Sequence, residues 1–203
     1  MDDRTLQAWQ GHPAVYVVDN AVDFEDKINR AVAQIYRILG ESAPEPGKRK
    51  FLVSMPDQSA LTRHYGAQPL EMMQTYLLSS DPDVERRIRQ QAGVGEQLFF
   101  YATKRTAEDG TRWVTERPIS EKDYVTYLME ADLALHSVRK LKYRFNYDGH
   151  RMELDVYPFS KDRAVLFVYG QEPFRLPPEI EVLRDVTGDP TYKNRALAST
   201  QRL

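Results

Sequence analysis

The sequence contains no cysteine, which excludes disulfide bonds and metal sites built on thiolates. It also lacks a long apolar run, since a segment such as Ala164 to Tyr169 is far too short to span a bilayer. The first residues, beginning Met1, Asp2 and Asp3, are acidic and have no apolar core, unlike a secretory signal peptide. These absences predict a cytoplasmic protein without a transmembrane segment.

An excess of charge of one sign is missing as well. The 203 residues include 28 Lys and Arg against 30 Asp and Glu, a net charge of -2. Affinity for a polyanion must therefore come from the placement of charges rather than from their total. DNA is not an expected partner. Hydrophobic residues make up 41% and charged residues 29%, which suits a folded chain with a polar cavity.

The first 43 residues predict a strand followed by a helix. Residues 14–18 form a short apolar run that ends in Asp19 and Asn20, which favour a helix cap. Apolar residues then recur at helical spacing before Gly40, namely Phe24, Ile28, Ala31, Val32, Ile35 and Leu39. An unpaired strand edge and an apolar helix face need cover, so residues 14–39 predict docking or a homodimer. Residues 42–47, with two prolines, indicate a linker before a second domain over residues 48–203.

The second part predicts an α+β fold made mostly of antiparallel strands. Asp109-Gly110 and Asp148-Gly149 are strong hairpin signals, and Ser120 with Asp123 is a helix start signal. Many strands joined by hairpins suggest a barrel or a sandwich. The expected strands are 48–54, 72–79, 83–91, 97–105, 111–119, 138–147, 150–157 and 164–169; the expected helices are 59–65, 120–131, 179–186 and 192–197.

Several of these strands carry a row of charge on one face, because side chains two residues apart point the same way. The rows are Arg87 and Arg89; Lys140, Lys142 and Arg144; and Glu153 and Asp155. Two interpretations remain open. The rows could face solvent, as charged rows usually do, or they could line a tunnel while the apolar faces pack outward.

Six segments, taken in order, resemble the CYTH family, the triphosphate tunnel metalloenzymes: Lys50-Phe51-Leu52-Val53, Glu85-Arg86-Arg87-Ile88-Arg89, Thr103-Lys104, Glu116-Arg117-Pro118-Ile119-Ser120, Lys140-Leu141-Lys142-Tyr143 and Glu153-Leu154-Asp155-Val156. The resemblance covers about residues 48 to 170 and implies an eight-stranded antiparallel β-barrel enclosing a polar tunnel, with flanking helices. Residues 9–27 resemble the end of a kinase-like P-loop domain found before such barrels. The phosphate-cradling motif G-x-x-x-x-G-K-[ST] is absent, so residues 1–43 would be a remnant or the C-terminal end of that domain.

The resemblance also implies site residues. The residues implied for phosphate binding are Lys50, Arg87, Arg89, Lys104, Lys140, Lys142 and Arg144. The carboxylates implied for a metal are Glu116, Glu153 and Asp155. Other expected carboxylate positions hold Pro46, Lys48, Val114, Phe167 and Tyr169. One Mg or Mn ion held together with substrate phosphates is compatible with this set, whereas a two-metal site is not. Alternatively, Glu153 and Asp155 pair with the basic residues and hold the fold.

Three functions follow as hypotheses. The leading one is binding of a polyphosphorylated anion (a nucleoside triphosphate, inorganic polyphosphate or a phosphoinositide head group) with little or no hydrolysis. The second is a working metal-dependent triphosphatase with an altered metal site. The third is a structural or interaction module of a larger ATPase.

Overall fold

The computed structural model describes residues 27–28, 30–32, 34–35, 47–92, 97–106, 112–170 and 172–203. The chain divides into two units, Met1–Ala43 and Pro44–Leu203. In the first unit the described residues are helical, as the apolar spacing predicts. The strand expected over 14–18, most of the linker and the turn at Asp109-Gly110 lie outside the described residues. None of the helices in the described part of the chain has the length and apolar character needed to span a bilayer.

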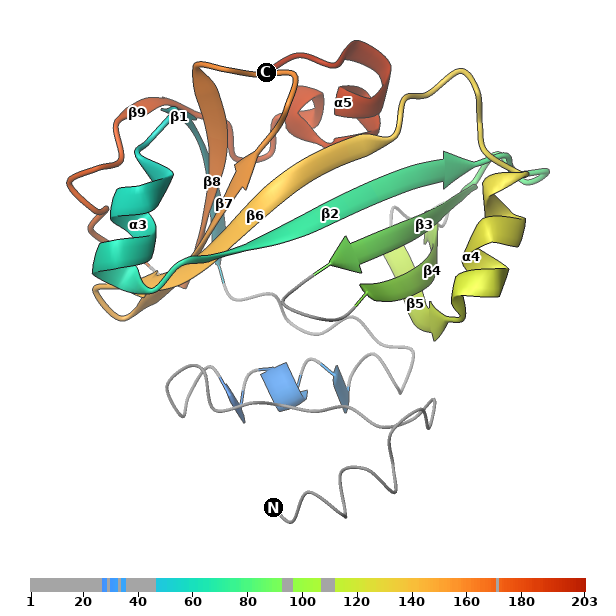
Figure 1. Ribbon diagram of the computed structural model, residues 1–203, viewed down its shortest axis with the longest axis horizontal. Helices are drawn as coiled ribbons and strands as arrows, with labels where there is room; N and C mark the ends of the chain where they lie inside the picture. Colours follow the sequence, from blue (N-terminus) through green and yellow to red (C-terminus); the bar gives the residue numbers. More distant parts are fainter. Residues whose placement is uncertain are drawn as a thin grey trace. The chain divides into compact units, whose positions relative to one another are not determined.

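The second unit is built on one antiparallel sheet of nine strands, in the order β5-β4-β3-β2-β6-β7-β8-β1-β9. β2 and β6 run side by side through its middle (Figure 1). The strands are β1 (Lys48–Ser54), β2 (Gln68–Leu77), β3 (Val84–Ala92), β4 (Gln97–Thr106), β5 (Arg112–Ile119), β6 (Val138–Tyr147), β7 (His150–Val156), β8 (Arg163–Tyr169) and β9 (Val182–Asp185).

The predicted eight-stranded closed barrel is therefore wrong in two respects. The sheet has nine strands, and it is open, since within the described residues β5 pairs only with β4 and β9 only with β1. The extra strand lies where we expected a helix over 179–186. Its apolar residues Val182 and Leu183 are exposed, so they do not form the buried face that a helix here would need. The other eight strands are confirmed to within a few residues.

Two helices cover the apolar face of the sheet, one toward each end (Figure 1). α3 (Gln58–Tyr65) buries Leu61 against apolar side chains of β1, β6, β7 and β8. α4 (Glu121–Leu128) buries Tyr124 against Leu77 and Ile88. It begins at the predicted capping box, in which Ser120 accepts from the Asp123 amide and Asp123 binds back to Ser120.

The C-terminal segment packs against the opposite face. It consists of the short helix η1 (Pro190–Tyr192) and α5 (Asn194–Thr200), close to the helix expected over 192–197. Tyr192 and Leu197 pack with residues of β1, β2, β6, β7 and β8, namely Leu52, Tyr76, Val138, Tyr157 and Val165. Among the described residues, the C-terminal segment thus covers one end of the face opposite α3 and α4.

Candidate functional site

Strand register places every residue expected to bind phosphate or metal on one face of the sheet, which we call the charged face. Residues directly opposite each other in an antiparallel pair point to the same side. The face can therefore be followed from strand to strand through the pairs Lys50–Phe167, Phe167–Glu153, Glu153–Arg144, Asp155–Lys142, Lys140–Met72, Gln74–Arg89, Tyr76–Arg87, Glu85–Lys104 and Ala102–Glu116.

Cations and carboxylates alternate between β6 and β7 on this face. Lys140 donates to Asp155, and Lys142 donates to Glu153 and lies 3.4 Å from the second oxygen of Asp155. Arg144 Nε lies 3.3 Å from Glu153 Oε1. The side chain of Asp155 is fully buried, and those of Lys140, Lys142 and Glu153 are nearly so. We call this set of ion pairs, formed by Lys140, Lys142, Arg144, Glu153 and Asp155, the ladder. Because a buried charge is costly unless it is paired, the ladder stabilises the pairing of β6 with β7.

The surroundings shift the pKa values of Glu153 and Lys140. Burial would raise the pKa of Glu153, but the nearby cations Lys142 and Arg144 outweigh it and lower that pKa to about 2. Burial lowers the pKa of Lys140 despite its bond to Asp155. Glu153 consequently stays ionised throughout the physiological pH range.

A second set of ion pairs lies on β3, β4 and β5. Arg87 donates to Glu85 at 3.3 Å, and Arg89 donates to Glu116 at 2.9 Å. The Arg89 guanidinium also lies 4.7 Å from the centre of the Phe100 ring. Both arginines are about one-quarter exposed, so they remain accessible to a ligand. Glu116, a candidate metal ligand, is here the partner of a predicted phosphate-binding residue.

The pairing of β1 with β8 forms a corner rich in lysine and aromatic rings. Lys48 lies opposite Tyr169 and Lys50 opposite Phe167. The ammonium groups of both lysines lie over these rings, and Lys50 also donates to the carbonyl of Tyr192. Burial, followed by repulsion from Lys48, lowers the pKa of Lys50 to about 8.

One end of the charged face is closed. Along β1, β7 and β8 the side chains change from charged or aromatic at Lys48, Glu153 and Tyr169 to apolar at Leu52, Tyr157 and Val165, which pack under η1 and α5. Arg195 of α5 lies over the ring of Tyr76 and 3.9 Å from Glu85. Among the described residues, η1 and α5 therefore cover the end of the charged face away from Lys48 and Arg144.

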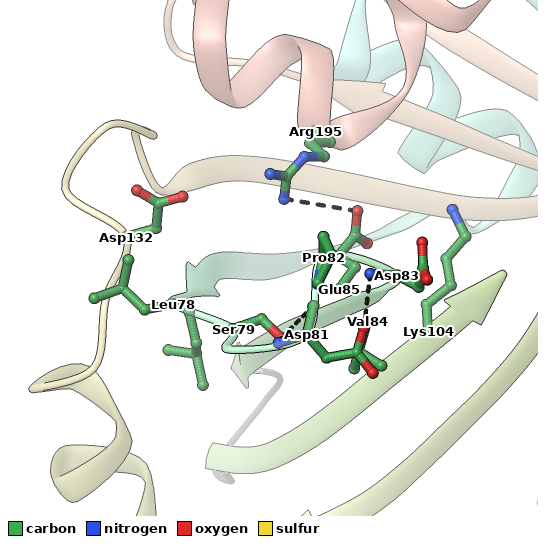
Figure 2. A pocket seen from close by; sticks show the side chains of 11 residues that line it. Leu78, Ser79, Asp81, Pro82, Asp83, Val84, Glu85, Lys104, Asp132 and Arg195 are labelled. Carbon is green, nitrogen blue, oxygen red and sulfur yellow. Dashed lines mark hydrogen bonds and ion pairs between the residues drawn. The ribbon is translucent and has the colours of Figure 1, made fainter.

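Lys104 lies opposite Glu85 and lines a cavity of about 400 Å³ beside α5. Figure 2 shows Arg195 reaching Glu85 across this cavity, with Asp81, Asp83 and Asp132 around it. These carboxylates repel an anion. The register that brings the other cations together thus leaves Lys104 in acidic surroundings.

The carboxylates present do not fit a resident divalent ion. Among the described residues, no three His, Asp or Glu side chains come together as a set that could hold a metal. Glu153 accepts from Lys142 and, at 3.1 Å, from the Tyr169 hydroxyl, and it lies 3.3 Å from Arg144 Nε; Asp155 accepts from Lys140. The oxygens that a metal would need already bind cations of the protein.

The phosphate-binding set implied by the resemblance omits four side chains that the structure brings to the site. Lys48, Phe167 and Tyr169 stand at positions where the resemblance implies carboxylates, so none of them belongs to that set. Arg151, which lies 3.9 Å from the centre of the Tyr169 ring, was not noted at all. Alternation along β7 places Arg151 on the same face as Glu153, and this signal was available in the sequence.

Comparison with known proteins supports a CYTH-like domain. No protein-family model and no curated protein matches the sequence. A solved structure named the inorganic triphosphatase NE1496 is 26% identical, with a TM-score of 0.56, over 78% of this chain and 97% of that one. A second structure, named the hypothetical protein NE1496, gives 26% identity and a TM-score of 0.55 over 76% of this chain and 98% of that one. These likenesses do not support the prediction that residues 1–43 belong to a P-loop domain.

We predict that Glu153→Gln destabilises the fold, because Lys142 and Arg144 lose the carboxylate that pairs with them. Removing one partner of a buried pair costs about 3–5 kcal/mol, whereas Glu121→Gln, an exposed control on α4, changes the free energy of unfolding by less than about 0.5 kcal/mol. Urea unfolding at pH 7 measures both.

The same variant tests the pKa of Glu153. A carboxylate with a lowered folded-state pKa stabilises the fold above its unfolded-state pKa, and that stability is lost as pH falls through the folded-state value of about 2. The gap between parent and Glu153→Gln should therefore shrink below about pH 4. An unchanged gap at pH 3, or no destabilisation at pH 7, would contradict the structural role of this ladder.

Proposed function

We propose that this protein binds a polyphosphorylated anion on the charged face directly through its own cations, with little or no metal-dependent hydrolysis. The observation that carries the proposal is the charge balance of that face. Its cations (Lys48, Lys50, Arg87, Arg89, Lys104, Lys140, Lys142, Arg144, Arg151) outnumber the carboxylates on the same strands (Glu85, Glu116, Glu153, Asp155), and each of these carboxylates already pairs with one of the protein's cations. The name of the similar protein, an inorganic triphosphatase, supports a triphosphate-type ligand.

In this proposal the arginines and the lysines of the charged face have different roles. Guanidinium groups of Arg87, Arg89 and Arg144 present paired donors that match phosphate oxygens. Lys48 and Lys50 supply compact positive charge at the corner of β1 and β8. The buried ladder of Lys140 and Lys142 with Asp155 and Glu153 holds these donors in place. Because η1 and α5 close one end, the proposal favours a short anion, or the end of a longer chain, entering from the other end.

A metal-dependent triphosphatase is the second candidate, favoured by the likeness to a protein named an inorganic triphosphatase. The third candidate, a structural module of a larger ATPase, would use residues 1–43 as the end of a nucleotide-binding domain. Phosphate release from tripolyphosphate that requires Mg2+ or Mn2+ would favour the second. Absence of any anion binding would favour the third.

We predict that tripolyphosphate raises the melting temperature of the parent protein by several degrees, because a ligand that binds only the native state stabilises it. In Arg87→Ala/Arg89→Ala the shift caused by the anion should be lost, since both guanidinium groups face the ligand. Lys122→Ala, on the exposed surface of α4, should keep the full shift. A thermal-shift titration in EDTA measures all three, and an unchanged melting temperature of the parent would refute the proposal.

The lowered pKa of Lys50 predicts a pH dependence. Anions bind the protonated amine, so the affinity for sulfate, whose charge is constant in this range, should fall as pH rises through about 8. Lys50→Arg keeps its charge and should bind sulfate equally at pH 7 and pH 9. The other charges acting on this amine are those of Lys48, Asp155, Lys140 and Asp189. Equal loss of affinity in the parent and Lys50→Arg would show that another group titrates.

A further inference from the structure

Two aromatic rings of β8, Phe167 and Tyr169, lie beside three lysines of the charged face. Lys48 Nζ lies 4.9 Å from the centre of the Phe167 ring and 5.2 Å from that of Tyr169. Lys50 Nζ and Lys142 Nζ lie 5.1 Å and 5.5 Å from the centre of Phe167. A cation at such distances is attracted by the negative face of the ring. One phenyl ring therefore gathers three ammonium groups that repel one another.

Lys48 differs from the other lysines in what holds it. Lys140 and Lys142 donate to buried carboxylates, and Lys50 donates to the carbonyl of Tyr192. Lys48 makes only the two ring contacts among the described residues. A ring face attracts an ammonium group but does not cancel its charge or occupy its three donors as a carboxylate does. Lys48 thus keeps its full charge and its donors for an external acceptor.

The position of Lys48 suits that role. It is the first residue of β1, paired with Tyr169 at the end of β8, and so lies at the end of the charged face away from Leu52 and α5. Its side chain is half-buried, and the side chains of Phe167 and Tyr169 are half-buried as well. An anion entering from the open end meets this lysine before it reaches the buried ladder.

We propose that Lys48 binds the terminal phosphate of the ligand, and that Phe167 and Tyr169 are positioning residues that hold this lysine without neutralising it. Lys50, over the same ring, contributes charge from two residues further along β1. This inference rests on the proposed function and specifies its strongest subsite. The ligand class is an oxyanion with a free terminal phosphate, bound without a divalent ion.

Calorimetric titration of the full chain with inorganic tripolyphosphate, in EDTA, tests the subsite. Lys48→Met should weaken binding by about tenfold or more, as expected for loss of a charged hydrogen bond. Phe167→Leu should weaken it by roughly three- to tenfold through loss of the ring. Phe167→Tyr, which keeps the ring, should restore the parental affinity.

Two controls separate this effect from general damage. Lys122→Met removes an exposed lysine of α4, and Phe99→Leu removes a ring from the apolar face of the sheet, where it lies 4.8 Å from Tyr124. Both should bind tripolyphosphate like the parent. The melting temperature without ligand checks each fold. If Phe167→Leu fails to fold, Lys48→Met still tests the subsite, since within the described residues the Lys48 ammonium group contacts only rings.

The possible results are distinct. Parental affinity in Lys48→Met would overturn the subsite while leaving the proposed function intact. Equal weakening in Phe167→Leu and Phe167→Tyr would overturn the positioning role of the ring. If the parent binds no tripolyphosphate at all, the proposed function and the subsite are both wrong.

Discussion

The register between β6 and β7 is the constraint on which the rest of the site depends. It places Lys142 opposite Asp155 and Arg144 opposite Glu153, so that cations and carboxylates interleave in the middle of the sheet. A shift of one residue would turn these side chains toward the apolar face, where Leu154 and Tyr143 now pack under α3. Because unpaired charge cannot be buried cheaply, this register is strongly specified, and it aligns the neighbouring strands on both sides.

The same pairing decides what the site can bind. Glu153, Asp155 and Glu116 each pair with a lysine or an arginine, so these carboxylates balance part of the positive charge of this face. At the corner of β1 and β8, aromatic rings take the place of carboxylates beside Lys48. Within the part of the chain that the structure describes, the Lys48 ammonium group therefore has rings and no carboxylate beside it. The described part of the face thus has a buried, paired centre and a half-buried corner, at which we propose that the anion binds.

Much of the fold was predictable from local patterns. Period-two alternation and the Asp148-Gly149 hairpin identified β6, β7 and the face that their charges share, and the Ser120 and Asp123 signal identified the start of α4. Side-chain alternation and register are short-range properties, and for that reason the sequence pattern predicted that the candidate residues share faces.

The failures concern properties that no single segment contains. Whether a sheet closes depends on how its edge strands meet, and β9 occupies an edge that a closed barrel would not have. β9 itself is short and exposed, so it shows no alternation that would separate it from a helix. The acidic surroundings of Lys104 come from the β2–β3 loop and from Asp132, far from it in sequence. Likewise, the contact of Lys48 with the rings of Phe167 and Tyr169 depends on the pairing of β1 with β8, which neither segment shows alone.

The most direct test of the account is the affinity for tripolyphosphate measured twice, once in EDTA and once with excess Mg2+, while released phosphate is followed. If the cations of the protein bind the anion themselves, the affinity in EDTA equals or exceeds that with Mg2+, falls as salt screens the charges, and phosphate release stays at background. Binding that requires Mg2+, or turnover that EDTA abolishes, would contradict the account and identify a metal-dependent triphosphatase.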